Sequence, residues 1–200
     1  MKKYGDYFIK DGKFIGKFEE MYQSFEDPWN QTKSYDDLSR QMVAHHINKN
    51  KIKSSVEFGC GLGKTMNFLY SKTGINMLGI DISETCIKKA KEAFPNLSFK
   101  VDNVENILEY ANYECYFFSE ITWCLLENKL IDRIFKLMQE YLNGKYFIHN
   151  LVFYKGQQQY GNNYFTNLNE FIDFCPFNLI TKVEIDNVED DCIYTSSIFK

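Results

Sequence analysis

Ser55-Val56-Glu57-Phe58-Gly59-Cys60-Gly61-Leu62-Gly63-Lys64-Thr65 is the segment from which the architecture of this 200-residue chain can be predicted. It predicts a short strand with an acidic residue near its end, a loop with glycine at every second position, and the start of a helix. Glycine lets a backbone approach a ligand closely, and a helix N-terminus offers free N–H groups and the positive end of the helix dipole. The segment therefore predicts a binding loop for a nucleotide-like ligand.

Three ligands compete for this loop. The dinucleotide fingerprint G-x-G-x-x-G fails, because Lys64 or Met66 stands where its last glycine should be. A P-loop would use Gly63-Lys64-Thr65, but Phe58 stands where its first glycine should be. S-adenosylmethionine has no phosphates, and its sulfonium and ammonium groups suit an acidic residue such as Glu57 beside a loop of close approach.

The composition of the chain narrows the class of protein. Its length predicts one domain with a sizeable core. The net charge of −4, with arginine only at Arg40 and Arg133, argues against a nucleic-acid partner. We find no apolar run long enough for a membrane span and no signal-peptide core, so we expect a cytoplasmic protein without a membrane partner. The six cysteines are scattered without a C-x-x-C pair, so we expect neither a disulfide framework nor a metal site.

Strand and helix patterns alternate after residue 50, which is typical of a parallel α/β sheet. We expect strands at 55–58, 77–82, 97–101, 113–119 and 146–152, and helices that include 126–142 and 168–174. Two last strands, 179–185 and 193–199, are joined by a tight acidic turn and must be antiparallel. Before residue 51, apolar spacing predicts a helix at 14–25 and a second from a Ser34 cap to about 48. We interpret both as a lid in front of the sheet.

Acidic side chains stand at the ends of four predicted strands: Glu57, Asp81, Asp102 and Glu120. Ligands of open α/β sheets bind beyond the carboxyl ends of the strands. Asp81 follows Gly63 by 18 residues (81 − 63), where an acidic residue can accept both ribose hydroxyls. Asp102 can reach an adenine amine, although capping of the following turn is an equal alternative. The ordered set favours S-adenosylmethionine over a nucleoside triphosphate.

Gly59-Cys60-Gly61-Leu62-Gly63 and Gly79-Ile80-Asp81 give the chain a resemblance to class I S-adenosylmethionine-dependent methyltransferases over roughly residues 14–200. The resemblance implies a Rossmann-like α/β fold with helices on both faces of a seven-stranded, mostly parallel sheet. Its strand order would be 3-2-1-4-5-7-6, with the last strand antiparallel. Residues 51–200 would form the methyltransferase domain, and residues 1–50 an N-terminal helical cap of the same domain.

The same resemblance implies S-adenosylmethionine as cofactor and S-adenosylhomocysteine as product. An arginine can bind the carboxylate of the cofactor bidentately, although a surface helix charge is the alternative for Arg40. The tryptophan of the cap would face the cofactor, with a core aromatic as the alternative. The residues expected to bind the cofactor are Glu57, Gly59, Cys60, Gly61, Gly63, Asp81, Ile82, Asp102, Asn103, Val104, Trp29 and Arg40.

Two shorter motifs resemble a subset of this family that acts on small molecules and surface sugars: Phe18-Glu19-Glu20-Met21-Tyr22 with Asp27-Pro28-Trp29, and Ser119-Glu120-Ile121-Thr122-Trp123. The subset includes nodulation-type methyltransferases and enzymes of bacterial capsule clusters, some linked to O-methyl phosphoramidate decoration. This resemblance implies O-methylation of a small sugar-, nucleotide- or phosphoramidate-type acceptor by a monomer or homodimer. A P-loop-like protein that binds nucleoside triphosphates, and a non-catalytic module that binds S-adenosylmethionine, are the alternatives.

Methyl transfer requires an acceptor atom about 3 Å from the methyl carbon, and a hydroxyl acceptor also requires a base. His149, at the end of the fifth predicted strand, is the first candidate, with a core histidine as the alternative. Glu120 is the second candidate, as base or as orienting group. An anionic acceptor would need no base. The residues expected to contact the acceptor are Tyr22, Trp123, Tyr160 and Tyr164, the last two in a polar loop at 154–166.

Overall fold

The structure is a computed structural model that describes residues 5–32, 38–156, 158, 160–189 and 191–200. Its main sheet has seven strands in the order β5-β4-β3-β6-β7-β9-β8. Counted from the first strand of this sheet, the order is 3-2-1-4-5-7-6, and β9 pairs antiparallel with both β7 and β8. The predicted fold is therefore confirmed. The strands are β3 (Ser54–Phe58), β4 (Asn76–Asp81), β5 (Ser98–Val101), β6 (Cys115–Ser119), β7 (Tyr146–Tyr154), β8 (Leu179–Asn187) and β9 (Cys192–Phe199).

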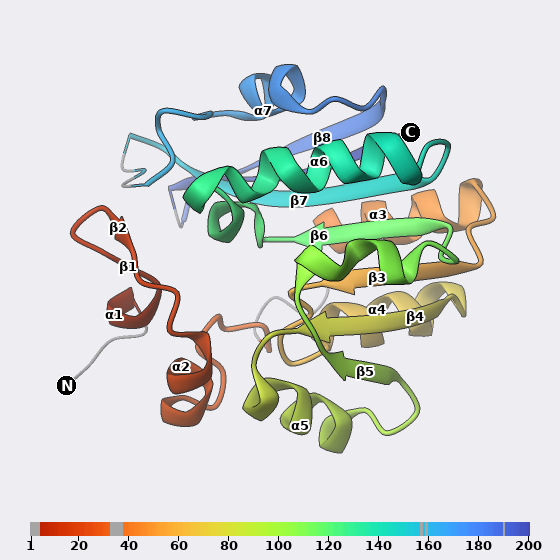
Figure 1. Cartoon of the computed structure of the whole chain (residues 1–200), viewed down its shortest axis with the longest axis horizontal. Helices are drawn as coiled ribbons and strands as arrows, with labels where there is room; N and C mark the ends of the chain where they lie inside the picture. The colour runs from red at the N-terminus through yellow and green to blue at the C-terminus, as the bar shows by residue number, and fades with distance from the viewer. Residues whose placement is uncertain (1–4, 33–37, 157, 159, 190) are drawn as a thin grey trace.

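Helices cover both faces of the sheet, so the molecule has three layers (Figure 1). One layer holds α3 (Leu38–Lys49), α4 (Lys64–Thr73) and α5 (Glu84–Ala93). The other holds η1 (Val104–Tyr110), α6 (Leu130–Tyr141) and α7 (Leu168–Phe174). The central strands are buried on both sides, which explains the nearly continuous apolar run in β6. Among the described residues, no helix is both long and apolar enough to cross a membrane.

The long helix predicted at 126–142 begins later than expected. Short 3₁₀ turns, η2 (Thr122–Leu125) and η3 (Glu127–Lys129), precede α6. The break occurs because Asn128 and Lys129 adopt left-handed φ values of 52° and 55°. Such residues cannot continue a right-handed helix, and apolar spacing alone gave no indication of them.

The N-terminal cap contains a β-hairpin as well as helices, whereas the sequence predicted helices alone. The cap segment, which we define as residues 5–32, holds α1 (Gly5–Phe8), a hairpin of β1 (Ile9–Lys10) and β2 (Lys13–Phe14), and α2 (Phe18–Ser24). The hairpin turns at Asp11 and Gly12, which have φ values of 51° and 71°. Of the helix predicted at 14–25, only the C-terminal part forms, as α2, so the cap segment is not wholly helical.

The second predicted cap helix is also placed differently. Helix α3 packs against α4 and against β9 and β8, so it belongs to a layer of the sheet and is not a lid. The predicted Ser34 cap lies outside the described residues. The cap segment itself lies beyond the edge of the sheet to which the arrows of β4 and β6 point (Figure 1). We call this edge, where the parallel strands end, the carboxyl edge.

The cap segment is anchored on α5, which lies beside α2 (Figure 1). The Glu19 carboxylate accepts hydrogen bonds from Ser83 Oγ at 2.6 Å, Thr85 N at 3.2 Å and Thr85 Oγ1 at 2.5 Å. Lys89 Nζ donates to the carbonyl oxygen of Tyr22 at 2.9 Å. Because a carboxylate at a helix N-terminus satisfies free N–H groups and faces the positive end of the dipole, Glu19 is a favourable anchor.

Replacing Glu19 by alanine should loosen this anchor. We expect E19A to lower the free energy of unfolding by about 1–2 kcal/mol, measured by urea denaturation at pH 7. Burial raises the pKa of Glu19, but the hydrogen bonds from Ser83 and Thr85 prevail and hold the pKa below its ordinary value. The stabilisation is therefore present above the ordinary glutamate pKa and is lost as the pH falls through the lower pKa of the folded state.

Glu20 provides the matched control for this variant. It is the next residue of α2 and is exposed, and among the described residues its carboxylate contacts only Lys17, in a surface ion pair of 3.2 Å. We expect E20A to change the free energy of unfolding by less than about 0.5 kcal/mol. Equal losses for E19A and E20A would contradict the anchoring role of Glu19.

Candidate active site at the carboxyl edge of the sheet

The glycine loop, residues 59–63, joins β3 to α4 at the carboxyl edge. Gly59, Gly61 and Gly63 have φ values of 73°, 54° and 73°, which side-chain-bearing residues rarely adopt. A Cβ atom on Gly59 would lie 1.9 Å from Cγ2 of Ile121. The N–H groups of Gly59 and Cys60 donate to the carbonyl oxygen of Ile80 at 2.7 and 3.0 Å. The alternating glycines are therefore required by backbone shape and close packing, and β4 fixes the loop.

Asp81 ends β4 directly beside this loop. Its Oδ2 accepts the N–H of Gly61 at 3.1 Å, and its Oδ1 accepts the N–H of Ser83 at 3.0 Å. Burial raises the pKa of Asp81, and backbone hydrogen bonds from Ser83, Gly61 and Ile82 partly oppose the rise. A carboxylate has about four acceptor sites, so these three bonds leave capacity for a further donor. Acceptance of ribose hydroxyls by Asp81 stays a prediction from the sequence.

Glu57 lies in β3, one residue before the loop, with only 1% of its surface exposed. Burial raises the pKa of Glu57 to about 8, although the positive charge of Arg40 lowers it. Among the described residues, Oε2 of Glu57 has no hydrogen-bond partner. Arg40 is buried at the start of α3, so it is not the surface charge that the sequence left as its alternative. A buried acid with an unused acceptor atom fits a cationic ligand group such as an ammonium.

These features match the parts of S-adenosylmethionine. Asp81 suits its ribose, and Glu57 suits its ammonium group. Ile82, which follows Asp81, is 51% exposed and offers apolar surface at the same edge. When bound, the cofactor supplies an activated methyl group, and the residues described here would hold and orient it.

The cap segment closes over this site through an apolar cluster of Tyr7, Met21, Tyr22, Leu62 and Cys86. Trp29 packs on the cluster from the side and contacts the Phe8 ring, with centroids 5.1 Å apart. Burial, together with the nearby Cys86 and Asp81, raises the pKa of the Tyr22 hydroxyl well above its usual value. Tyr22, predicted to contact the acceptor, therefore lies on the side of Asp81.

Asp102 is engaged within its own segment. It accepts hydrogen bonds from Lys100 Nζ at 2.7 Å, from Asn106 Nδ2 at 2.6 Å and from the Tyr110 hydroxyl. Burial raises its pKa, but the hydrogen bonds from Lys100 and Tyr110 hold the pKa well below its usual range. Asn103 caps η1 through the N–H of Glu105. In this structure Asp102 therefore holds the turn that follows β5, which is the capping role given as the alternative to adenine binding.

His149 is not placed as a general base, and we correct that assignment. Its side chain has no exposed surface and stacks on Phe171, with ring centroids 3.8 Å apart. Nε2 lies 2.7 Å from the hydroxyl oxygen of Thr122, and burial lowers the pKa of His149 to about 3. A neutral, enclosed imidazole cannot reach an acceptor, so the alternative of a core histidine is the better description.

Glu120, the second candidate, is exposed at the end of β6. Its φ of 62° is unusual for a residue with a side chain, and Oε2 accepts the N–H of Val152 at 2.9 Å. Such backbone geometry is concentrated at functional sites. Trp123, predicted to contact the acceptor, is instead buried and donates from Nε1 to the Val152 carbonyl at 3.2 Å. The structure therefore gives Trp123 a place in the core.

Tyr160 and Tyr164 flank the region beyond β7. The Tyr160 ring stacks on Phe14 of the cap segment at 6.1 Å, and its hydroxyl donates to Glu127 Oε1 at 3.1 Å. Tyr164 donates to the carbonyl oxygen of Leu126 at 3.1 Å. Tyr160 therefore connects the cap segment with the predicted acceptor side of the sheet.

Sequence reasoning missed Gln31 and Thr122. Gln31 contacts the glycine loop, and Thr122 is the partner of His149. Glutamine carries no distinctive chemistry, so only its position two residues after Trp29 could have indicated it.

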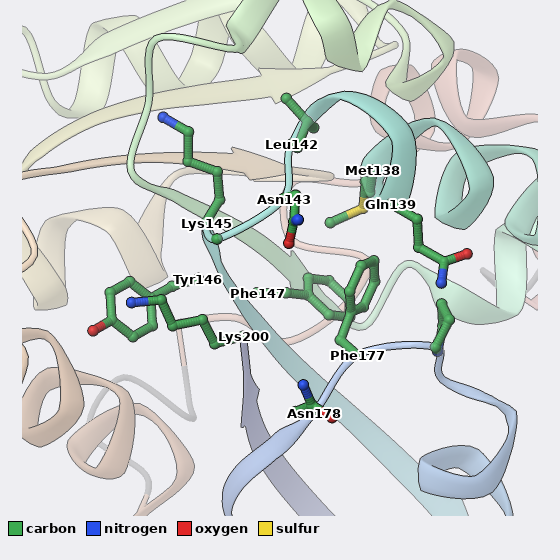
Figure 2. A pocket seen from close by; sticks show the side chains of 12 residues that line it. Met138, Gln139, Leu142, Asn143, Lys145, Tyr146, Phe147, Phe177, Asn178 and Lys200 are labelled. Carbon is green, nitrogen blue, oxygen red and sulfur yellow. The ribbon is translucent and has the colours of Figure 1, made fainter.

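A cavity of about 250 Å³ lies away from this site, where α6 ends and β7 begins (Figure 2). Phe147 and Phe177 line it together with amides and with Lys145 and Lys200, but no carboxylate does. Lys200 Nζ lies 4.8 Å from the centroid of the Tyr146 ring. This cavity is at the opposite edge of the sheet from the glycine loop, so we do not place the function there.

Comparisons with known proteins relate part of the sequence to methyltransferases. Residues 56–144 match the family model described as "Methyltransferase domain". A segment of 56 residues is 43% identical to "Putative methyltransferase 235L" of Invertebrate iridescent virus 6, and the match spans 27% of this chain and 21% of that protein.

Solved structures show the same fold. An S-adenosylmethionine-dependent methyltransferase from Clostridium acetobutylicum superposes with a TM-score of 0.62 at 12% identity, over 90% of this chain and 98% of that one. The PH0226 protein from Pyrococcus horikoshii gives 0.61 at 15% identity, over 92% and 99%. Residues 56–144 therefore match a methyltransferase domain, and the chain as a whole has the Rossmann-like fold of these methyltransferase structures.

We expect Glu57 to make cofactor binding dependent on pH. Because burial raises its pKa to about 8, Glu57 is protonated at pH 7 in the free protein. An ammonium group pairs with the ionised form, so binding releases a proton, and affinity should rise with pH up to about 8. We expect a gain of up to about tenfold per pH unit for S-adenosylhomocysteine, measured by calorimetry between pH 6 and 9. E57Q should show a much flatter profile, and a wild-type affinity independent of pH would contradict this role.

Proposed function

We propose that this protein transfers the methyl group of S-adenosylmethionine to an oxygen atom of a small polar acceptor. One observation carries the proposal: two buried carboxylates, Glu57 and Asp81, flank a loop of left-handed glycines at the carboxyl edge. One carboxylate suits a ribose and the other a cation, which together describe this cofactor. We further propose a cytoplasmic monomer or homodimer that acts without nucleic acid.

The alternative of a nucleoside triphosphate site has less support. Phe58 stands at the position of the first P-loop glycine and is a buried strand residue, 1% exposed. Lys64, the lysine of the P-loop-like tail, has Nζ 5.2 Å from the centroid of the Phe94 ring. A P-loop needs backbone amides around the phosphates and a lysine that reaches them. Neither requirement is met by this arrangement.

A cavity of about 390 Å³ lies beyond the end of β7, on the side where we propose that the acceptor binds. Phe153 and Ile193 line it together with polar residues, which are Tyr154, Lys155, Gln158, Asn162 and Thr166. A mixed lining with several hydrogen-bonding side chains favours a ligand with hydroxyl or phosphate-like groups. This supports a sugar-, nucleotide- or phosphoramidate-type acceptor, and the short motifs around Trp29 and Glu120 support a role in capsule biosynthesis.

Glu120 is the residue we propose to act at the acceptor. It is exposed at the carboxyl edge, and the hydrogen bond from Val152 holds one of its oxygens. We propose that its carboxylate orients a hydroxyl and accepts its proton as the methyl group is transferred. An acceptor that is already anionic would need no such base.

Binding measurements separate the proposed cofactor from a nucleotide. We expect S-adenosylhomocysteine to bind and ATP not to bind in calorimetric titrations. D81N should weaken S-adenosylhomocysteine about 10- to 100-fold, because hydrogen bonds to a charged group are lost. Asp132, an exposed aspartate on α6, provides the control variant D132N, which should bind as the wild type does. Tight ATP binding without S-adenosylhomocysteine binding would refute the proposal, and binding without turnover on any acceptor would leave a non-catalytic module.

The two predicted catalytic residues should respond differently to substitution. E120Q should lower kcat at least about tenfold on a hydroxyl acceptor, with little change in cofactor affinity. H149N should lower the melting temperature, because it removes buried packing against Phe171, and should keep kcat within about threefold. A large loss of kcat in H149N at unchanged melting temperature would restore the histidine as a catalytic residue.

A further inference from the structure

Gln31 of the cap segment lies directly on the glycine loop. Its Oε1 accepts the N–H of Leu62 at 2.9 Å. A Cβ atom on Gly61 would lie 2.6 Å from Nε2, 2.7 Å from Oε1 and 3.0 Å from Cδ of Gln31. The amide group therefore rests against the middle glycine, in space that opens only because Gly61 has no side chain.

The hydrogen bonds of the loop explain why Gln31 is held there. The N–H groups of Gly59, Cys60, Gly61 and Gly63 donate to Ile80 O, Ile80 O, Asp81 Oδ2 and Cys60 O. Leu62 is different, since its N–H donates to a side chain from the cap segment. This bond occupies the oxygen of the Gln31 amide. Among the described residues no acceptor faces Nε2, so its two N–H donors are available to a ligand.

A tight turn fixes the position of Gln31. The Asp27 carboxylate accepts the N–H of Gln31 and the N–H of Thr32, each at 2.9 Å. Asn30 adopts a left-handed φ of 51° within this turn. These hydrogen bonds hold the backbone of Gln31 at its own N–H and at the N–H of the next residue, so its side chain extends toward the loop from a fixed position.

We propose that Gln31 is a cofactor-binding residue that donates from Nε2 to the carboxylate of the methionine portion of S-adenosylmethionine. Asp81, and Glu57 once pairing with the ammonium group has ionised it, would place negative charge around the loop, so the carboxylate would need uncharged or cationic donors nearby. Gln31 supplies an uncharged donor while its oxygen stays on Leu62. The inference rests on the proposed function only for the identity of the cofactor and holds for any acceptor.

A matched pair of ligands tests this assignment. S-adenosylhomocysteine carries the carboxylate, and S-adenosyl-3-thiopropylamine is the same molecule without it. In calorimetric titrations, Q31E should bind S-adenosylhomocysteine about 10- to 100-fold more weakly than the wild type, because the N–H donors become a repelling carboxylate. Q31E should bind the amine with wild-type affinity or more tightly. The glutamate keeps the size of the side chain and the oxygen that accepts from Leu62.

Gln139 provides the charge control. It is exposed on α6, at the opposite edge of the sheet, and Q139E adds the same charge far from the glycine loop. Q139E should leave both affinities within about twofold of the wild type. Equal weakening of both ligands in Q31E would overturn the proposal, because Gln31 would then only brace the loop. Tighter binding of S-adenosylhomocysteine in Q31A would also overturn it, because the amide would then block the site.

The Asp27 turn gives an independent check. If Asp27 acts by placing Gln31, D27A and Q31A should each weaken S-adenosylhomocysteine, and the double variant should be no weaker than Q31A alone. Additive losses would contradict placement of Gln31 by this turn and with it the proposal. Melting temperatures measured without ligand identify any variant that has lost its fold. Failure of the wild type to bind S-adenosylhomocysteine at all would refute the cofactor, which is distinct from the pattern that refutes Gln31.

Discussion

The carboxylate of Asp81 holds together the parts on which the site depends. One oxygen accepts the N–H of Gly61 in the glycine loop, and the other accepts the N–H of Ser83 at the start of α5. Ser83 in turn caps α5 and donates to Glu19 of the cap segment. The loop, the helix and the cap segment are therefore linked through consecutive hydrogen bonds at the end of β4. A ribose bound at Asp81 would meet a carboxylate that is already oriented by backbone donors, which reduces the entropy lost on binding.

The candidate site is formed by two parts of the chain, the cap segment and the strand ends of the sheet. Glu19 anchors it on α5, Tyr22 reaches the side of Asp81, and Gln31 rests on the loop. At its other end, Phe14 stacks on Tyr160 beyond β7. The same segment thus contacts both the glycine loop and the predicted acceptor side. The sheet alone would offer the strand ends without a cover.

The sequence predicted the sheet well because its patterns are local. Alternating glycines, strand-end acids and an apolar run over β6 each report on the backbone within a few residues. The alternation of elements predicted a parallel sheet, and the order of its strands came from the resemblance to class I methyltransferases. The misplaced residues depend on long-range packing. His149 was expected at the end of a strand, and in the structure it packs against Phe171 of α7. Trp123 was expected to contact the acceptor, and it packs against Phe165 in the segment after β7. The late start of α6 depends on two left-handed residues that apolar spacing does not report.

Glu57 shows why a site of this kind can be stable before its ligand arrives. An ionised carboxylate in this position would carry a large desolvation penalty, and the charge of Arg40 offsets it only in part. With its pKa raised to about 8, Glu57 takes up a proton on folding and enters the core as a neutral group. Between the ordinary glutamate pKa and this value, folding therefore becomes less favourable as the pH rises. A cationic ligand reverses the balance, because it supplies the charge that makes the ionised form favourable. The residue that weakens the free protein at high pH is thus one that would favour a positively charged ligand in the buried space beside the glycine loop.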